Sequence, residues 1–175
     1  MRTSHILFIL LLFGINTSSC QENNIAEAEK NKIIIQNIKQ KMDTINRVEL
    51  TEEEWKKKLS PEQYFVLREK GTERPWTGEF NMHFEKGKYV CAGCGLELFN
   101  SSSKFESHCG WPSFDNEIKK GHIKTQTDYS HGMIRKEIMC ARCGGHLGHV
   151  FDDGPTQTGL RYCVNSLSID FEKEK

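Results

Sequence analysis

Three polar side chains near the C-terminus have the types and the spacing for thiol chemistry. Residues 159–166 are rich in β-branched and aromatic side chains and contain no proline, which favours a β-strand. Because successive side chains of a strand point to opposite faces, Arg161, Cys163 and Asn165 would share one face. A cation beside a thiol favours the thiolate, the nucleophilic form of cysteine. A small buried cysteine with an unrelated arginine nearby would give the same pattern.

Four of the seven cysteines form two Cys-x-x-Cys pairs, each followed by a glycine that permits a tight turn. Four thiolates at this spacing suit tetrahedral zinc, which would join two hairpins that are remote in sequence. Disulfides are the alternative, because exported proteins often contain them. The paired spacing favours zinc. The four proposed ligands are Cys91, Cys94, Cys140 and Cys143.

With Cys20 assigned to the N-terminal segment described below, Cys109 and Cys163 remain. A nucleophile and a second thiol are the minimum for thiol chemistry that ends in a disulfide. A purely structural disulfide between these cysteines is the alternative. Cys109 lies in a stretch stiffened by glycine and proline, which predicts a fixed loop.

Two histidines could supply protons. His146 and His149 are three positions apart and would face opposite ways on a straight strand, but Gly148 permits a bend that brings both to one site. Imidazoles near a thiolate can donate protons or bind metal. Because four thiolates are already available for zinc, we favour proton donation. Two surface histidines on a glycine-rich loop are the alternative.

The elements that must position these residues follow an N-terminal targeting segment. Residues 1–19 carry Arg2 and an apolar run too short to span a bilayer, which predicts a signal peptide. The segment Thr17-Ser18-Ser19-Cys20 resembles the cleavage box of bacterial lipoproteins, although that family prefers leucine where Thr17 stands. We therefore expect export to the bacterial cell envelope with a lipid on Cys20. Ordinary cleavage near Ser19 is the alternative.

Residues 20–46 are polar and predict a tether, and residues 47–172 predict one domain. Thr51 with Glu54 forms a capping box, and Ser60-Pro61 begins a second helix that Gly71 ends.

Alternating apolar residues then predict a hairpin over 79–90, and the strand face that begins at Arg161 is expected to continue through Leu167, Ile169 and Phe171. Short strands after two helices predict an α+β fold that is mainly antiparallel β. The 24 basic and 24 acidic residues balance, which argues against a nucleic-acid partner.

Six motifs occur in a fixed order between about 47 and 171. They are Thr51-Glu52-Glu53-Glu54-Trp55, Gly71-Thr72-Glu73-Arg74-Pro75, Cys91-x-x-Cys94, Cys109-Gly110-Trp111-Pro112-Ser113-Phe114, Gly145-His146-Leu147-Gly148-His149-Val150-Phe151 and Arg161-Tyr162-Cys163-Val164-Asn165-Ser166. This set resembles the methionine-R-sulfoxide reductases of the B class. One small departure is His108, where many members of that family have glycine.

The resemblance implies a fold of two antiparallel sheets and a role for each candidate residue. It implies that Cys163 attacks the sulfoxide sulfur, that Cys109 resolves the product into a disulfide, and that Trp111 contacts the substrate methyl group. It also implies a structural zinc on the four paired cysteines. The residues implied to assist at the sulfoxide oxygen or to hold the thiolate are His146, His149, Asn165 and Arg161.

The same resemblance implies oxidised methionine in proteins as substrate and a thioredoxin-like reductant. We expect a monomer whose membrane contact is limited to the signal or lipid anchor. Two other functions remain open on the sequence: a zinc-clipped binding module without turnover, and a protein thiol-disulfide exchanger. Neither alternative accounts for the sequence as well. A binding module leaves Cys109, Cys163 and the histidines unexplained, and an exchanger would use a Cys-x-x-Cys pair that here is better suited to metal.

Overall fold

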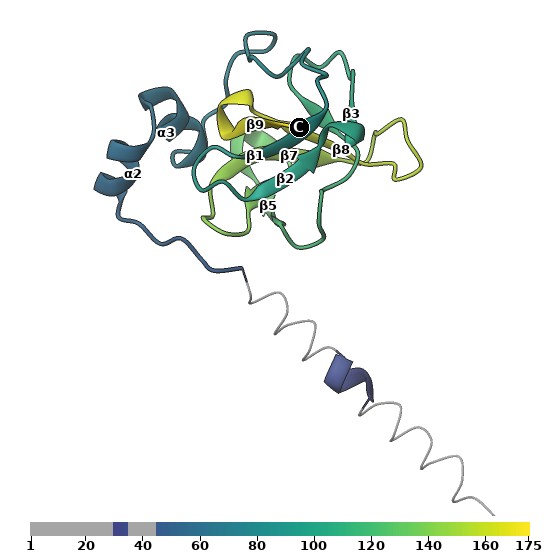
Figure 1. Cartoon of the computed structure of the whole chain (residues 1–175), viewed down its shortest axis with the longest axis horizontal. Helices are drawn as coiled ribbons and strands as arrows, with labels where there is room; N and C mark the ends of the chain where they lie inside the picture. The colour runs from purple at the N-terminus through teal and green to yellow at the C-terminus, as the bar shows by residue number, and fades with distance from the viewer. Residues whose placement is uncertain (1–29, 35–44) are drawn as a thin grey trace, which may run out of the picture. The chain divides into compact units, whose positions relative to one another are not determined.

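The computed structural model describes residues 30–34 and 45–175 (Figure 1). Residues 30–34 are helical and exposed, and they belong to a first unit, whereas Ile45–Lys175 form a second compact unit that contains the predicted domain 47–172. The predicted signal peptide, Cys20 and most of the predicted tether lie outside the described residues. None of the helices in the described part of the chain is long and apolar enough to cross a membrane.

Two short helices lead into the β structure, and each begins as the sequence predicts. Helix α2 spans Glu52–Lys58 and helix α3 spans Pro61–Leu67. Both have a complete capping box, with Thr51 and Ser60 as N-caps, so backbone N–H groups that lack helical partners are satisfied locally. The predicted end of the second helix is close to the observed one. The left-handed residue there is Lys70, at φ 58°, and the next residue, Gly71, donates its N–H to the Phe65 carbonyl.

The strands form two antiparallel sheets, which confirms the predicted fold class. The three-stranded sheet has the order β2-β1-β9, and the six-stranded sheet has the order β3-β4-β8-β7-β6-β5 (Figure 1). The smaller sheet contains β1 (Gly87–Cys91), β2 (Glu97–Asn100) and β9 (Ile169–Lys173). The larger sheet contains β3 (Lys104–Phe105), β4 (Ser113–Phe114), β5 (Ile123–Asp128), β6 (Arg135–Cys140), β7 (His146–Phe151) and β8 (Arg161–Val164). Short 3₁₀ turns are η1 (Ser101–Ser103), η2 (Ser130–Gly132) and η3 (Ser166–Ser168).

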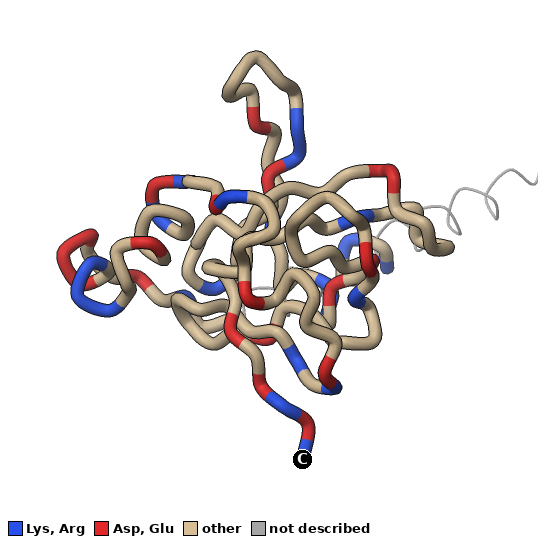
Figure 2. The backbone as a smooth tube through the Cα atoms, turned by 90° about the horizontal axis from the view of Figure 1, so that it is seen from above, with Lys and Arg blue, Asp and Glu red and all other residues tan. Residues whose placement is uncertain are grey.

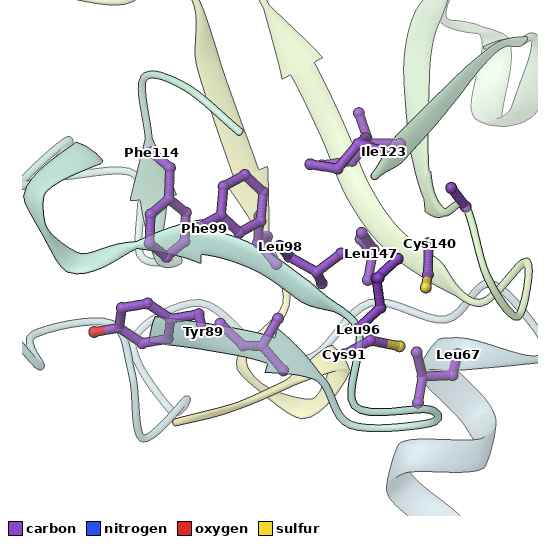
Figure 3. Packing of buried hydrophobic residues seen from close by; sticks show 14 of the residues in the cluster. Leu67, Tyr89, Cys91, Leu96, Leu98, Phe99, Phe114, Ile123, Cys140 and Leu147 are labelled. Carbon is purple, nitrogen blue, oxygen red and sulfur yellow. The ribbon is translucent and has the colours of Figure 1, made fainter. Parts of the chain in front are cut away.

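An apolar core fills the space between the two sheets and the leading helices. Phe99 of β2 stacks on Phe114 of β4 with ring centroids 4.2 Å apart, and Tyr89 of β1 meets the same Phe114 ring edge-on at 5.0 Å. Figure 3 shows these rings at one end of the core and the sulfurs of Cys91 and Cys140 at the other end. Two of the predicted metal ligands, Cys91 and Cys140, therefore belong to the buried core, and Cys94 and Cys143 pack against it.

The predicted hairpin over 79–90 is wrong. Its second strand exists as β1, but residues 79–82 form a turn, residues 83–85 have no regular structure, and Met82 and Phe84 are exposed. The reason is that β1 pairs with β2 on one side and with β9 on the other, so neither edge is free for 79–85. The alternation of apolar residues predicted that β1 pairs with the residues just before it, whereas in the fold that edge of β1 pairs with β9, about eighty residues later along the chain.

The predicted continuous strand from Arg161 to Phe171 is also interrupted. β8 ends at Val164, the 3₁₀ turn η3 follows, and the chain then enters the other sheet as β9. Asn165 therefore lies past the end of the strand, at the crossing between sheets, and does not continue the alternation of Arg161 and Cys163. Ile169 is buried as expected, whereas Leu167 and Phe171 are only partly buried.

Charged residues of both signs are interspersed along the described backbone (Figure 2). Several form exposed ion pairs, such as Lys88 with Glu97 at 2.6 Å and Lys173 with Glu85 at 2.8 Å. Exposed pairs of this kind contribute little because water screens them and long side chains lose entropy. These exposed pairs therefore contribute little to the stability of the domain compared with its apolar core.

Candidate active site

A row of polar side chains that includes Cys163 crosses the larger sheet. Cys163 of β8 is directly paired with Ser113 of β4 on one side and with His149 of β7 on the other. The row continues through Glu137 of β6 and Gln126 of β5, which are the next register partners. Directly paired residues of antiparallel strands present their side chains on the same face. The sheet register therefore places the predicted nucleophile beside a predicted proton donor.

A second row lies two residues further along the same strands and carries charges. Arg161 and Phe151 are register partners, and the Arg161 guanidinium lies 4.5 Å from the centre of the Phe151 ring. Arg161 also makes two 2.8 Å hydrogen bonds to Asp153. At the other end of the row, Asp128 is paired with Arg135. These contacts hold the Arg161 guanidinium near Cys163. The hydrogen bond with Cys109 and burial raise the pKa of the Cys163 thiol, and the charge of Arg161 opposes that rise.

The side chains of Cys109 and Cys163 lie close together. Cys109, in the loop between β3 and β4, has its Sγ 3.7 Å from the Sγ of Cys163. A disulfide requires about 2.05 Å, so the sulfurs are separate thiols that are close enough to become bonded after a small movement. Hydroxyl groups surround Cys109, with Ser107 Oγ at 3.0 Å and Ser113 Oγ at 3.5 Å.

The two thiols share their protons as a pair. The hydrogen bond with Cys163 lowers the pKa of Cys109 to about 4, with further help from Ser107 and Ser113. The same hydrogen bond, together with burial, raises the pKa of Cys163, and Arg161 opposes this rise. The first proton leaves the pair readily because the remaining S–H stabilises the thiolate, and the second proton leaves with difficulty. The resting pair therefore carries one proton and one negative charge, shared across the contact between the two sulfurs.

Gly148 brings the two histidines together, as the sequence suggested it could. Its φ is 151°, and the pairing of β6 with β7 is irregular at this point. A Cβ at this position would collide with the carbonyl oxygen of Cys163. The irregularity turns His146 toward His149, with ring centroids 5.6 Å apart. Glycine is required here by both the backbone angle and the close approach of β8.

Each histidine is held by a different carboxylate. His149 Nε2 lies 2.8 Å from Asp128 Oδ2, and His146 Nδ1 lies 2.8 Å from Glu137 Oε1. His146 and Glu137 are almost fully buried, and Lys70 lies 2.8 Å from the other oxygen of Glu137. Burial lowers the pKa of His146, against the opposing effect of Glu137. The Nε2 atom of His146 is buried and has no hydrogen-bond partner among the described residues.

A cavity of about 120 Å³ opens beside Cys163. Trp111 and Phe151 give it apolar walls, and His149, Asn165 and Arg135 give it polar ones. Its remaining lining residues are Thr72, Gly148, Cys163 and Val164. His146 is not among the residues that line this cavity. A larger cavity of about 340 Å³ is lined in part by Glu73, and no cysteine or histidine is among its described lining residues.

Two of the cavity walls are fixed by the backbone of one residue. Trp111 Nε1 donates to the Glu73 carbonyl at 3.2 Å, and Glu73 N donates to Asn165 Oδ1 at 3.1 Å. The Nδ2 group of Asn165 donates to the Leu147 carbonyl at 3.1 Å. The segment Gly71–Pro75, which in the sequence served only as one of the six family motifs, therefore holds Trp111 and Asn165 in place at the cavity.

The site contains residues that the sequence reasoning missed, namely Asp128, Arg135, Glu137 and Glu73. Asp128, Arg135 and Glu137 are single charged residues in strands, where such residues normally face solvent, so nothing in their local sequence distinguished them. Glu73 was noted only as part of the Gly71–Pro75 motif. The available signal was the location of Asp128 and Glu137 on strands that flank the Gly-His-Leu-Gly-His motif. That signal becomes usable only when the strand register is known.

The two Cys-x-x-Cys pairs form a second site in the core. Their four sulfurs all lie within 4.8 Å of one another, with Cys91–Cys143 at 3.6 Å and Cys94–Cys140 at 3.5 Å. Zinc with four thiolates at about 2.3 Å separates its ligands by about 3.8 Å, so the cluster fits that ion. Arg142 and Arg68 donate to the carbonyls of Cys94 and Cys143, which holds both turns in place. The predicted ligand set is thus assembled with zinc-compatible geometry.

A thiol pair beside carboxylate-held histidines, on two antiparallel sheets with a four-cysteine cluster, defines a thiol-based redox protein. A model of the SelR domain matches residues 59–173. A peptide methionine sulfoxide reductase MsrB from Leptospira interrogans is 58% identical over 127 residues, which cover 73% of this chain and 97% of the relative.

Proteins of the same name from Bradyrhizobium diazoefficiens and Methanosarcina barkeri are 56% and 57% identical, over 93% and 90% of their lengths and 74% and 73% of this chain. The chain belongs to the SelR domain family, in its MsrB group. The resemblance drawn from the six motifs is therefore confirmed at the level of the family.

Proposed function

We propose that this protein reduces the R epimer of methionine sulfoxide in peptides to methionine. The observation that carries the proposal is the 3.7 Å approach of Cys109 to Cys163 at a cavity walled by Trp111 and His149. A nucleophile, a second thiol, an apolar wall and a proton donor are the groups that this reaction requires. The names of the MsrB relatives support the same activity.

In the first step the sulfur of Cys163 attacks the sulfoxide sulfur. The thiol proton of Cys163 passes to the Cys109 thiolate, 3.7 Å away, which makes Cys163 the nucleophile when substrate arrives. The sulfoxide oxygen leaves sulfur only when it is protonated, and His149 is placed to donate that proton. The oxygen ends on Cys163 as a sulfenic acid, and the substrate leaves as a thioether. One thiol and one sulfoxide thus give one sulfenic acid and one methionine.

In the second step the Cys109 thiol condenses with the Cys163 sulfenic acid. The sulfur–sulfur bond forms, and the hydroxyl of the sulfenic acid leaves as water. An external dithiol then reduces the disulfide by exchange. We propose a thioredoxin-like protein as this donor.

The remaining site residues would bind and orient the substrate. Trp111 offers a rigid apolar surface to the methyl group, while Asn165 and His149 offer polar partners to the oxygen. Arg161 would stabilise the Cys163 thiolate as charge moves onto it. The role of His146 would be indirect, because its ring lies outside the cavity lining. Zinc on Cys91, Cys94, Cys140 and Cys143 would supply structural stability and not chemistry.

The decisive experiment is turnover with separated epimers of a methionine sulfoxide peptide. Oxidation of a thioredoxin-like donor should depend on the R epimer and should be near background with the S epimer. Equal turnover of both epimers would contradict the proposal. Donor oxidation without any sulfoxide would instead favour a thiol-disulfide exchanger, and absence of turnover with a bound zinc would favour a binding module.

Replacing Trp111 by alanine should weaken turnover of the R epimer. The indole provides the methyl wall and is fixed by its hydrogen bond to Glu73. Loss of that wall should cost on the order of 1–3 kcal/mol of binding, about 10- to 200-fold in kcat/KM. Steady-state kinetics with the R epimer measure the loss, and alkylation of Cys163 serves as the control because it should remain normal. Unchanged R turnover would remove Trp111 from the substrate contact.

Replacing Cys109 by serine should separate the two steps. One equivalent of methionine should still form, because the first step needs an attacking sulfur only at Cys163. Its rate should fall, since serine does not accept the proton as readily as a thiolate. Donor-dependent cycling should then stop for lack of a disulfide. Acid-quench assays of methionine per enzyme measure the single equivalent, and normal cycling in this variant would deny Cys109 the resolving role.

We also propose that the protein is exported to the cell envelope and anchored by a lipid on Cys20. The support is the arrangement of Arg2, a short apolar run and a lipoprotein-like cleavage box in the sequence. Replacing Cys20 by alanine should release the protein from the membrane fraction, as measured by fractionation and immunoblotting. Equal membrane retention of the two forms would argue against a lipid at this position.

A further inference from the structure

Among the described residues, Asp128 is contacted by two fixed hydrogen-bond donors and by one ring nitrogen of His149. Its Oδ2 lies 2.8 Å from His149 Nε2 and 2.7 Å from Arg135 Nη2, and its Oδ1 accepts the backbone N–H of Ser130 at 2.8 Å. The side chains of Asp128 and Arg135 are largely covered, at 16% and 22% exposure. The hydrogen bonds from Ser130, His149 and Arg135 lower the pKa of Asp128, which keeps it ionised at neutral pH.

This environment fixes the tautomer of His149. An ionised carboxylate can only accept hydrogen bonds, so His149 must carry its proton on Nε2. The only ring nitrogen then available to the cavity is Nδ1. Because His149 is the direct register partner of Cys163, its ring lies beside the sulfur that the proposed reaction oxidises.

We propose that Asp128 is a positioning residue that presents Nδ1 of His149 to the sulfoxide oxygen. This inference rests on the proposed function and assigns its proton donor to one histidine and one atom. In the imidazolium form, with Nε2–H held by Asp128, the Nδ1–H donates its proton to the sulfoxide oxygen and the ring is left as the neutral Nε2–H tautomer. Arg135 completes the arrangement by holding the same carboxylate oxygen while it lines the cavity.

The neighbouring carboxylate–histidine pair does not meet these requirements. His146 is held by Glu137 through Nδ1, and both side chains are buried away from the cavity lining. Lys70 and Gln126 bind the other oxygen of Glu137. That pair therefore supports the sheet behind the site, whereas the Asp128–His149 pair faces the substrate.

Asp128→Asn is a sharp test because the amide cannot satisfy three donors. With its oxygen toward His149 and Arg135, its NH₂ group faces the N–H of Ser130. In the opposite orientation, the NH₂ group faces His149 and drives its ring toward the other tautomer. Either way the hold on His149 is weakened with little change in volume. Asp152→Asn is the matched control, since Asp152 is exposed on the segment that follows β7.

The experiment uses the full-length protein and the R epimer of a methionine sulfoxide peptide. The single-turnover rate of methionine formation should fall about 10- to 100-fold in Asp128→Asn, as for other carboxylates that orient a functional histidine. The KM should change far less, because Trp111 and its partners are untouched. Asp152→Asn should match wild type in both quantities.

Nitrogen-15 NMR of the His149 imidazole reads the tautomer directly, with the signal assigned by its loss in His149→Gln. At a pH where the ring is neutral, wild type should show the Nε2–H form, and Asp128→Asn should show a mixture or the Nδ1–H form. An Nδ1–H form in wild type overturns the inference without any need for the Asp128 variant to fold. A wild-type single-turnover rate in folded Asp128→Asn also overturns it. Absence of R-sulfoxide turnover by wild type would instead refute the proposed function, so the two failures are distinguishable.

Discussion

The Cys163→Ser protein is expected to fold and to lose methionine sulfoxide reductase activity entirely. Serine is a far weaker nucleophile than cysteine at neutral pH, and its hydroxyl cannot accept oxygen from a sulfoxide to form an acid that condenses with a thiol. The turnover of the Cys163→Ser protein should therefore be at background in both the single-turnover and the cycling assay. This result differs from that of Cys109→Ser, which should retain one equivalent of methionine.

The folding control for Cys163→Ser is straightforward. Cys163 is only partly buried, and serine has nearly its size, so the melting temperature should stay within a few degrees of wild type. Substantial residual turnover in a folded Cys163→Ser protein would place the nucleophile elsewhere. Cys109 would then be the first candidate, because its hydrogen bond with Cys163 lowers its pKa to about 4.

Replacing Cys140 by serine is expected to destabilise the whole domain. Cys140 is fully buried at the end of β6, and its sulfur lies 3.5 Å from that of Cys94 in the four-cysteine cluster. Structural zinc contributes about 10–16 kcal/mol in isolated fingers. Typical domains have a total stability of about 5–15 kcal/mol, so the loss of one ligand should lower the melting temperature sharply or prevent folding.

Metal analysis and thermal melting test this prediction together. Wild type should contain one zinc per chain, and Cys140→Ser should contain less and melt earlier. Cys109→Ser is the matched control, since it removes a thiol outside the cluster and should keep both the zinc and the melting temperature. A wild-type protein without zinc, with its paired cysteines found as disulfides by mass spectrometry, would contradict the assignment.

The features that the sequence alone determined are those carried by short local patterns. The capping boxes at Thr51 and Ser60 define helix starts because their hydrogen bonds span three residues. The two Cys-x-x-Cys pairs indicated a four-sulfur site because each turn brings its own two thiols together. Gly148 was predicted to bend the chain near the histidines, and its φ of 151° agrees.

The tertiary structure decided everything that depends on strand register. β1 pairs with β9 across the length of the domain, which excluded the local hairpin. The register of β5, β6 and β7 brings Asp128 and Glu137 within hydrogen-bond distance of the two histidines. In the sequence, each of them resembles an ordinary surface carboxylate.

The state of the thiol pair also required the fold, because Cys109 and Cys163 are 54 residues apart and their pKa values depend on a 3.7 Å contact. The types of the reactive residues and their local spacing can be recognised in the sequence. The residues that shift the pKa values of the reactive groups are brought to them by strand pairing between remote segments. The alternation of polar and apolar residues does not specify which segments pair.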